Sequence, residues 1–542
     1  MSVIASPLAY LHLAAGRVKT LFQFPAPAEP PHYPFADSDI AMLDTLTRAP
    51  DGATIDEQSW EQLMLPQYAQ LLGQDVSIFG RQMLHRRLKA GLVDAPCVAQ
   101  VERVRALLAQ PAVLDELHLA CRPLRGADVE LAAPLFDTGP CPARPRWLDL
   151  VPLAFLAACG AAWFSGLAWA AIVIGMLTLM GLNVQYHALV LRWARLLGAL
   201  EALLLVCREL GRRGEPALAP FAPIGARAGQ LRGAISFNLG ESMSPLTIYR
   251  EWFFLGRVKD YFSLRRIVDA HADFLRECYL CVANFEADLA LARHLRSTEH
   301  CWAERHAGAA IALDAVVHPL LAQAAPLSIA LHERGAFVSG RNGVGKSTLL
   351  RTVGLNLIVA RAFGFCYARA ASVPFMPVYA SMQSEDTLLG GESLYIAELR
   401  RARQLLALAD GAHPGVYLID EIFRGTNHLE SVSAAASVLD QLAERAMVIV
   451  SSHNLVLAPL LAHRLQPLCV SEADDGSGLQ LRPGVLAHTN GITLLETQGF
   501  SPALRANAAR VFDWLSAYLA QGADCAHVLG AAPAPQEREA VH

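Results

Sequence analysis

Residues 340–347 read GRNGVGKS, a run whose residue types and spacing suit phosphate binding. In the pattern GxxxxGK[ST], glycines let backbone N–H groups turn towards phosphate oxygens, and the lysine ammonium reaches the β and γ phosphates. The Ser347 hydroxyl is a ligand that Mg²⁺ accepts in such a loop. An apolar strand candidate, GAFVSG, precedes the run and a helical pattern follows it, as the mechanism requires. The residues predicted to contact ATP are Gly340, Arg341, Asn342, Gly343, Val344, Gly345, Lys346, Ser347 and Thr348.

An acidic pair at the end of a second apolar strand candidate supplies the other half of this chemistry. In VYLIDEI, Asp420 is predicted to hold Mg²⁺ together with Ser347, directly or through water. Glu421 is predicted to act as the general base towards the attacking water. His453 ends the next strand candidate, MVIVSSH, at the ligand edge of a parallel sheet, so it is a candidate to sense the γ-phosphate or that water. A purely structural histidine at this strand end is the alternative.

The composition of the 542 residues sets this chain apart from an ordinary soluble enzyme. Hydrophobic residues make up 53% and charged residues only 18%, against about 25% charged in typical soluble domains. This excess indicates a membrane segment. The net charge of −5 gives no overall basic character, so any nucleic-acid surface must be local. The eleven cysteines include one CxxC, Cys278 to Cys281, without a second pair at zinc spacing, so free thiols and no structural metal are expected.

Residues 150–191 contain no Asp, Glu, Lys or Arg. A spanning helix needs about 20 apolar residues, so the run has room for two short crossings with a turn near Ser165–Gly166. Basic residues flank it on both sides, which favours both ends on the cytoplasmic side of a membrane. The sequence thus predicts a transmembrane helical hairpin that contacts the lipid bilayer through 148–191. A pair of buried helices in a large soluble core is the alternative.

The rest of the chain can be divided into segments by their hydrophobic pattern. Helical periodicity covers 54–120 and resumes after the apolar run, whereas from about 310 short apolar strand candidates alternate with helices, which is typical of a mostly parallel sheet with flanking helices. The predicted organisation is an N-terminal segment with a proline-rich linker (1–53), a helical region (54–147), the hairpin (148–191), a second helical region (192–309), an α/β P-loop NTPase domain (310–520) and a disordered tail (521–542). Five arginines of the second helical region could face anionic lipid, nucleic acid or solvent, and the sequence does not rank these: Arg208, Arg212, Arg213, Arg227 and Arg232.

Residues 420–426, Asp-Glu-Ile-Phe-Arg-Gly-Thr, resemble the run that the MutS family of ATPases carries after its acidic pair. Further segments are similar to MutS proteins in the same order: His318-Pro319, the Gly-x-Ser segment within 386–398, Thr489 to Ile492, and Gly499 to Pro502. The start of the helical region is similar to the MutS lever. The resemblance implies that two ATPase domains associate in a homodimer and that Ser393 contacts the partner's nucleotide in trans.

The chain also departs from mismatch-repair MutS proteins. Its phosphate loop, with Arg341 to Val344, is nearer to ABC-type ATPases, no Phe-x-Glu wedge occurs, and no recognition domain fits before residue 54. The chain is most similar to the membrane-anchored MutS-like proteins of bacteria. This resemblance implies a nucleotide-switched dimer that hydrolyses ATP with Mg²⁺, acts on double-stranded DNA in a process related to mismatch repair, and sits in the bacterial inner membrane with its ATPase domain in the cytoplasm.

Two alternatives stay open at this point. One is a membrane-associated P-loop ATPase of ABC or MutS type that acts on a membrane process without binding DNA. The other is a cytoplasmic, DNA-binding protein whose apolar run is only core.

Overall fold

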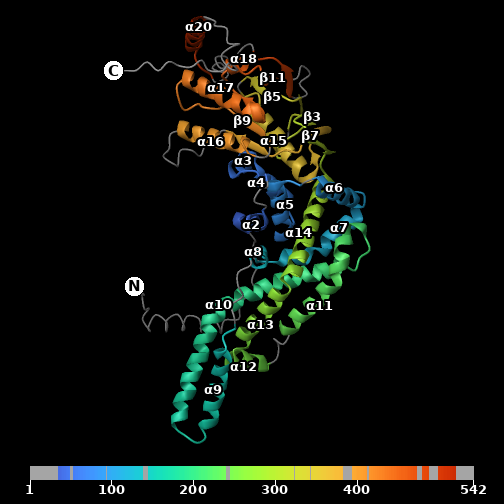
Figure 1. Ribbon diagram of the computed structural model, residues 1–542, viewed down its shortest axis with the longest axis vertical. Helices are drawn as coiled ribbons and strands as arrows, with labels where there is room; N and C mark the ends of the chain where they lie inside the picture. Colours follow the sequence, from blue (N-terminus) through green and yellow to red (C-terminus); the bar gives the residue numbers. More distant parts are fainter. Residues whose placement is uncertain are drawn as a thin grey trace, which may run out of the picture.

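The computed structural model describes residues 35–48, 53–92, 94–137, 144–239, 245–322, 324–341, 343–382, 394–411, 414–472, 479–486 and 499–519. The predicted linker at 25–34 and the predicted tail at 521–542 lie outside these residues. The molecule is elongated: a region of mixed strands and helices lies at one end, helices fill the middle, and α9 with part of α10 lies at the far end (Figure 1).

The helical region runs from α2 to α14. Its helices are α2 (Asp37–Thr47), α3 (Glu57–Gln62), α4 (Leu65–Leu72), α5 (Ile78–Ala90), α6 (Asp94–Leu108), α7 (Pro111–Ala120), α8 (Ala132–Phe136), α9 (Trp147–Ala161), α10 (Leu167–Leu210), α11 (Ala222–Leu239), α12 (Pro245–Phe254), α13 (Gly256–Ala270) and α14 (Ala272–Leu295), with 3₁₀ turns at Arg122–Gly126 and Pro216–Phe221.

Helix α14 forms the centre of this region, because α5 and α6 pack against it and most of its side chains are buried. A buried ion cluster joins the three helices. Arg87 of α5 lies 2.8 Å from Asp288 of α14, and both side chains are at most 2% exposed. Arg103 of α6 contacts the same carboxylate at 2.7 Å. Because removal of one partner would leave a buried charge unpaired, this cluster fixes how the three helices meet.

The apolar run folds as two helices that lie side by side, α9 and the first part of α10 (Figure 1). The turn between them falls at 162–166, where the sequence predicts it. Helix α10, however, continues without a break to Leu210, so the predicted limit at 191 falls inside a helix. By length and composition α10 is the one helix of the described residues that could cross a membrane, and only 11% of its most apolar window is buried.

The mixed region contains a six-stranded sheet in the order β12-β11-β5-β10-β9-β8, parallel except for β12. Its strands are β5 (Gly335–Gly340), β8 (Val378–Ser381), β9 (Val416–Asp420), β10 (Met447–Ser451), β11 (Leu465–Glu472) and β12 (Leu479–Pro483). Helix α15 (Lys346–Phe363) covers one face, where Leu418 points, and α16 (Leu394–Ala409) with α17 (His428–Arg445) covers the other, where Tyr417 points. Strands β5, β9 and β10 are therefore buried on both faces, which explains their unbroken apolar runs.

A second, four-stranded sheet was not predicted from the sequence. Its order is β2-β7-β3-β4, from β2 (Glu304–His306), β3 (Ile311–Val316), β4 (Leu327–Leu331) and β7 (Ala370–Pro374), beside a short pair, β1 (Cys301–Trp302) and β6 (Phe365–Cys366). Strands thus begin before the predicted domain start at 310. The predicted strand PFMPVYAS is divided between the two sheets, because Pro374 ends β7 and Pro377 precedes β8, and prolines cannot continue a ladder. Short helix α18 (Leu457–Leu460) and α20 (Pro502–Leu519) complete the region.

Candidate nucleotide-binding site

The phosphate loop leaves the end of the central strand β5 and enters α15. Gly343 has φ +78° and Gly345 has φ +97°, a left-handed conformation that glycine adopts without steric cost. Gly345 is the N-cap of α15, and no side chain caps the helix there. The first N–H groups of α15 are therefore available for an anion, and the helix dipole favours one. Asn342 lies outside the described residues.

Lys346 is folded back onto its own loop. Its Nζ donates to the carbonyl oxygens of Gly340 at 3.0 Å and Arg341 at 3.1 Å, and the side chain is 7% exposed. Burial lowers the pKa of Lys346, while the carboxylates of Asp420 and Glu421 act in the opposite direction. The charge of Lys346 thus lies in the field of the acidic pair, which brings the two predicted halves of the site together.

The acidic pair ends β9, the second strand from β5, with β10 between them. Asp420 is 4% exposed and its Oδ1 accepts a hydrogen bond from the Ser451 hydroxyl on β10. The backbone N–H of Glu421 donates to the carbonyl of Ser451 at 2.9 Å, although Glu421 itself has φ +55°. A positive φ is unfavourable for a residue other than glycine and occurs often at functional sites. It turns the Glu421 carboxylate away from the strand direction.

Two cationic or proton-donating side chains hold the Glu421 carboxylate. Nε2 of His453, which follows β10, lies 2.9 Å from Oε1, and Nε of Arg424 lies 3.2 Å from Oε2. The hydrogen bond from His453 is the largest cause that lowers the pKa of Glu421, with Arg424 and Lys346 adding to it against the effect of burial. Glu421 is therefore ionised at neutral pH. The structure brings the two predicted catalytic residues into direct contact.

The run Arg424-Gly425-Thr426 is explained by its contacts with α16 and α17. Oε2 of Glu398, on α16, accepts hydrogen bonds from the backbone N–H groups of Arg424 at 2.9 Å and Gly425 at 3.2 Å. A Cβ on Gly425 would lie 2.5 Å from the backbone nitrogen of Tyr395, so only glycine lets α16 approach this closely. Thr426 donates to Glu430 in the first turn of α17 at 2.7 Å. The run therefore joins the acidic strand end to two helices.

Glu398, Arg424 and Ser451 were not among the predicted site residues. The Arg-Gly-Thr run directly after the acidic pair was the available signal for Arg424, since charged residues beside a predicted base shift its pKa. Glu398 ends the segment 386–398 that resembles MutS proteins, but no local pattern connects Glu398 or Ser451 to Glu421. The predicted trans contact, Ser393, and the segment Thr489 to Ile492 lie outside the described residues.

The donor set fits Mg²⁺ held mainly by substrate. The described residues contain no group of three or more His, Cys, Asp or Glu side chains that could hold a metal. Asp420 offers one buried carboxylate at the strand end, and Ser347 opens α15. Mg²⁺ in ATPase sites takes one or two protein oxygens and completes its shell with phosphate and water, which matches so sparse a set.

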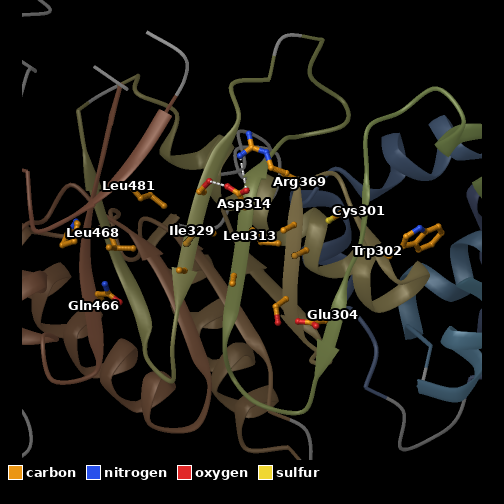
Figure 2. A pocket seen from close by; sticks show the side chains of 17 residues that line it. Cys301, Trp302, Glu304, Leu313, Asp314, Ile329, Arg369, Gln466, Leu468 and Leu481 are labelled. Atoms are coloured by element: carbon orange, nitrogen blue, oxygen red, sulfur yellow. Dashed lines mark hydrogen bonds and ion pairs between the residues drawn. The ribbon is translucent and has the colours of Figure 1, made fainter. Parts of the chain in front are cut away.

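A pocket of about 770 Å³ lies elsewhere, between the four-stranded sheet and strands β11 and β12 (Figure 2). Its lining is largely apolar, with Asp314 hydrogen-bonded by Ser328 and paired with Arg369 at its rim. None of the predicted ATP-contacting residues lines it, so the site chemistry rests on the strand ends and the loop rather than on this cavity.

The phosphate loop joins the parallel strand β5 to helix α15, and the acidic pair lies at the end of β9, two strands from β5 in the sheet. This arrangement defines a P-loop nucleotide-binding domain. Comparison with known proteins indicates the family that it resembles. Residues 336–499 match the family described as MutS domain V. The DNA mismatch repair protein MutS of Thermus thermophilus is 27% identical over 248 residues, 44% of this chain and 30% of that protein. The MutS of Myxococcus xanthus is 26% identical over 260 residues, 44% of this chain and 29% of that protein.

A third relative is Endonuclease MutS2 of Thermus thermophilus, 33% identical over 181 residues, 33% of this chain and 23% of that protein. The matched part is less than a third of the length of each of these relatives. These matches confirm the resemblance to the MutS family, and the match to the family model lies in the C-terminal part of the chain.

Proposed function

We propose that the chain binds and hydrolyses ATP with Mg²⁺ and uses the cycle as a conformational switch. The observation that carries this proposal is the Glu421 carboxylate, 11% exposed and held between His453 and Arg424 beside the phosphate loop. The same domain supplies uncapped N–H groups on α15 and the ammonium of Lys346. In the ATP complex, Lys346 exchanges the loop carbonyls for β- and γ-phosphate oxygens.

Hydrolysis follows from these positions. Glu421 accepts a proton from a water molecule, whose oxygen attacks the γ-phosphorus. The bond from this phosphorus to the β–γ bridging oxygen breaks, and its electrons leave with ADP. Ser347 and Asp420 would hold Mg²⁺, which would supply neutralisation of the phosphate charge. His453 orients the carboxylate and is placed next to the attacking water.

A dimer completes the site in this proposal, with Ser393 reaching the nucleotide of the partner. The resemblance to MutS proteins supports the composite site. Ser393 directly precedes α16, and α16 carries Glu398, which binds the backbone of Arg424 and Gly425. A displacement of α16 would therefore reach Glu421 through Arg424, which links nucleotide in one subunit to catalysis in the other.

The partner of the switch is proposed to be double-stranded DNA, as the names of the MutS relatives suggest. The alternative is a membrane process without DNA. The arginines of the second helical region do not decide between them, because three are already paired. Arg208, at the end of α10, and Arg212, just after it, pair with Glu209, and Arg213 pairs with Glu116. Arg227 lies over the ring of Phe274 at 4.2 Å.

The second part of the proposal is a membrane anchor formed by α9 and α10, with the ATPase domain in the bacterial cytoplasm. The apolar side chains of this hairpin face outward: Trp163 is 88% and Phe164 92% exposed at the tip. At the base, Trp147 is 43% exposed, about 24 Å from Trp163 at 1.5 Å per residue. Aromatic residues at both ends of an apolar band mark membrane interfaces, and this spacing is close to the ~30 Å of a bilayer's hydrocarbon core.

Helix α12 packs against both helices of this hairpin. Phe253 stacks on Phe155 of α9, and the carbonyl of Trp252 accepts from Asn183 of α10 at 3.3 Å. Trp252 and Phe254 of this helix are 39% and 40% exposed.

Duplex binding by the detergent-solubilised chain, with ADP or ATP and across a salt series, tests the choice of partner. Nanomolar to micromolar affinity that changes with nucleotide and falls steeply with salt supports a membrane-tethered DNA switch. ATP turnover without any duplex binding at low salt removes DNA from the proposal and leaves the membrane process.

A further inference from the structure

A pocket of about 540 Å³ lies where the helical region meets the mixed region, remote from the phosphate loop. Its walls come from α2 and α5 on one side and from β2, the end of α15 and the segment after β7 on the other. This volume is within the range of sites for small molecules. The pocket is therefore large enough for a nucleotide-sized ligand.

Four arginines line this pocket, one from each of four separate segments: Arg48, Arg86, Arg305 and Arg361. Among the described residues that line it, Asp44 is the single carboxylate, and it is already paired with Arg48. Arg305 is already engaged, since its Nη2 donates to the carbonyl of Leu92 at 2.6 Å. Arg86 and Arg361 have no carboxylate of their own among the described residues that line the cavity. Two like charges in one cavity are unfavourable unless an anion offsets them.

Arg361 has hydrogen-bonding capacity left over. It is 4% exposed, and its Nη2 donates to the carbonyls of Ala53 and Ala90. Its Nε and Nη1 have no partner among the described residues, although both atoms are buried. Burial lowers the pKa of Arg361 to about 10, and the charge of Arg305 acts in the same direction. A buried donor without an acceptor is unfavourable, so a ligand that accepts hydrogen bonds from these two N–H groups would be stabilised there.

The backbone shapes the pocket around Arg361. Gly91 has φ +73°, and a Cβ there would lie 2.7 Å from Cγ of Arg361, so the glycine lets the side chain pass. The ring of Phe375 lies 4.3 Å from the guanidinium carbon of Arg305 and 5.9 Å from that of Arg361. This aromatic contact holds the two guanidinium planes at the wall of the pocket.

The carboxyl end of α15 disfavours the binding of an anion, because a helix carries partial negative charge there. Its last carbonyls are already bound, however. The carbonyl of Ala360 accepts from Gly364 N–H at 3.0 Å and that of Arg361 from Leu92 N–H at 3.0 Å. The carbonyl of Phe363 accepts from the Gln100 amide at 3.2 Å. The guanidinium charges therefore outweigh the dipole at this end.

We infer that this pocket binds a small phosphate-bearing anion at a site separate from the phosphate loop. Guanidinium forks match phosphate oxygens two at a time, which a point-charge ammonium does not, and the described lining of the pocket contains arginines but no lysine. Free pyrophosphate and a nucleoside phosphate share the chemistry that it recognises. The inference does not depend on ATP hydrolysis.

Calorimetric titration of the full-length chain with pyrophosphate, at fixed salt, tests the inference. Lys346→Ala removes the phosphate-loop ammonium and is expected to leave pyrophosphate binding at the pocket intact. Arg86→Gln is expected to weaken this binding at least tenfold and Arg86→Glu to abolish it. Arg369→Gln, which removes an arginine that is 76% exposed in the same chain, is the matched control and is expected to change nothing. An unchanged melting temperature of the Arg86 variants shows that they are folded.

The outcomes separate clearly. Binding that survives Lys346→Ala and disappears in Arg86→Glu supports the pocket. Tighter binding of ADP than of pyrophosphate in the Lys346→Ala background, with the same dependence on Arg86, identifies the ligand as a nucleotide. Binding that is lost with Lys346 and unaffected by Arg86, binding only of a DNA duplex, or no binding at all overturns the inference.

Discussion

Nε2 of His453 lies 2.9 Å from Oε1 of Glu421, a contact between the ends of two neighbouring parallel strands. The opposite oxygen of the same carboxylate faces Nε of Arg424 at 3.2 Å. Glu421 is thus oriented from both sides before any nucleotide binds. Because the carboxylate is also ionised at neutral pH, it is ready to accept a proton, and the positions of its two neighbours decide its basicity.

Glu421→Gln is expected to keep ATP binding and to lower turnover by about 10²- to 10⁴-fold, the usual contribution of a general base. The glutamine keeps the size of the side chain and can still accept from His453, so the fold should not change. Phosphate release and binding of a fluorescent ATP analogue measure the two effects. Turnover at the wild-type rate in this variant would remove Glu421 from the mechanism.

Gly425→Ala is expected to lower ATP turnover at least tenfold, because the new Cβ would lie 2.5 Å from the Tyr395 backbone nitrogen and push α16 from the site. Gly233→Ala is the matched control, since a Cβ on that α11 glycine meets nothing within 4 Å. Steady-state turnover of both variants is the measurement. Equal rates would show that the close approach of α16 to Gly425 does not matter for catalysis.

Glu286→Gln is expected to stabilise the chain above neutral pH. Burial raises the pKa of Glu286 to about 7, against 4.5 for an ordinary glutamate, although Ser77 donates to it. The folded chain therefore holds a proton that the unfolded chain releases, and stability falls as the pH rises from about 4.5 to 7. The variant removes this loss, which is on the order of 3 kcal/mol at pH 8.

Thermal unfolding of wild type and Glu286→Gln between pH 5 and pH 8 measures this difference. The melting temperatures of the two proteins should be close at pH 5 and diverge as the pH rises, with the variant higher. A constant gap over the whole range would mean that Glu286 does not titrate in this window.

Ile174→Arg is expected to weaken membrane attachment. Ile174 lies about 12 Å from the tip of the hairpin at 1.5 Å per residue and is 65% exposed, so its side chain would face the middle of the bilayer. An arginine there costs about 2.5–3.5 kcal/mol on insertion. Leu119→Arg is the control, because Leu119 is 63% exposed on α7 of the helical region.

Flotation of both variants with phospholipid vesicles, followed by a high-salt wash, is the measurement. Attachment should be reduced for Ile174→Arg alone. Equal retention of the two variants, or release of the wild type by salt, would contradict insertion of α9 and α10.

The phosphate loop and the acidic pair could be predicted from the sequence because neighbouring residues supply all of their functional groups. The phosphate loop needs its glycines, Lys346 and Ser347 within one turn, and the acidic pair must end an apolar strand. The apolar run at 150–191 is likewise recognisable in the sequence, because it contains no charged residue. Short-range sterics and hydrophobicity decide these features wherever the rest of the chain lies.

Only the tertiary structure decided which distant groups meet. Glu398 reaches the backbone of Arg424 because α16 packs against the end of β9, and the second sheet forms because strands near 304 and 372 pair. The helical pattern at 58–72 is divided into α3 and α4 at Met64, whose φ is +58°. The arginines that share the pocket at 48, 86, 305 and 361 are spread over the chain, and each alone would be taken for a solvated surface charge. Packing, which brings several segments together at once, sets these contacts, and no local pattern in the sequence records them.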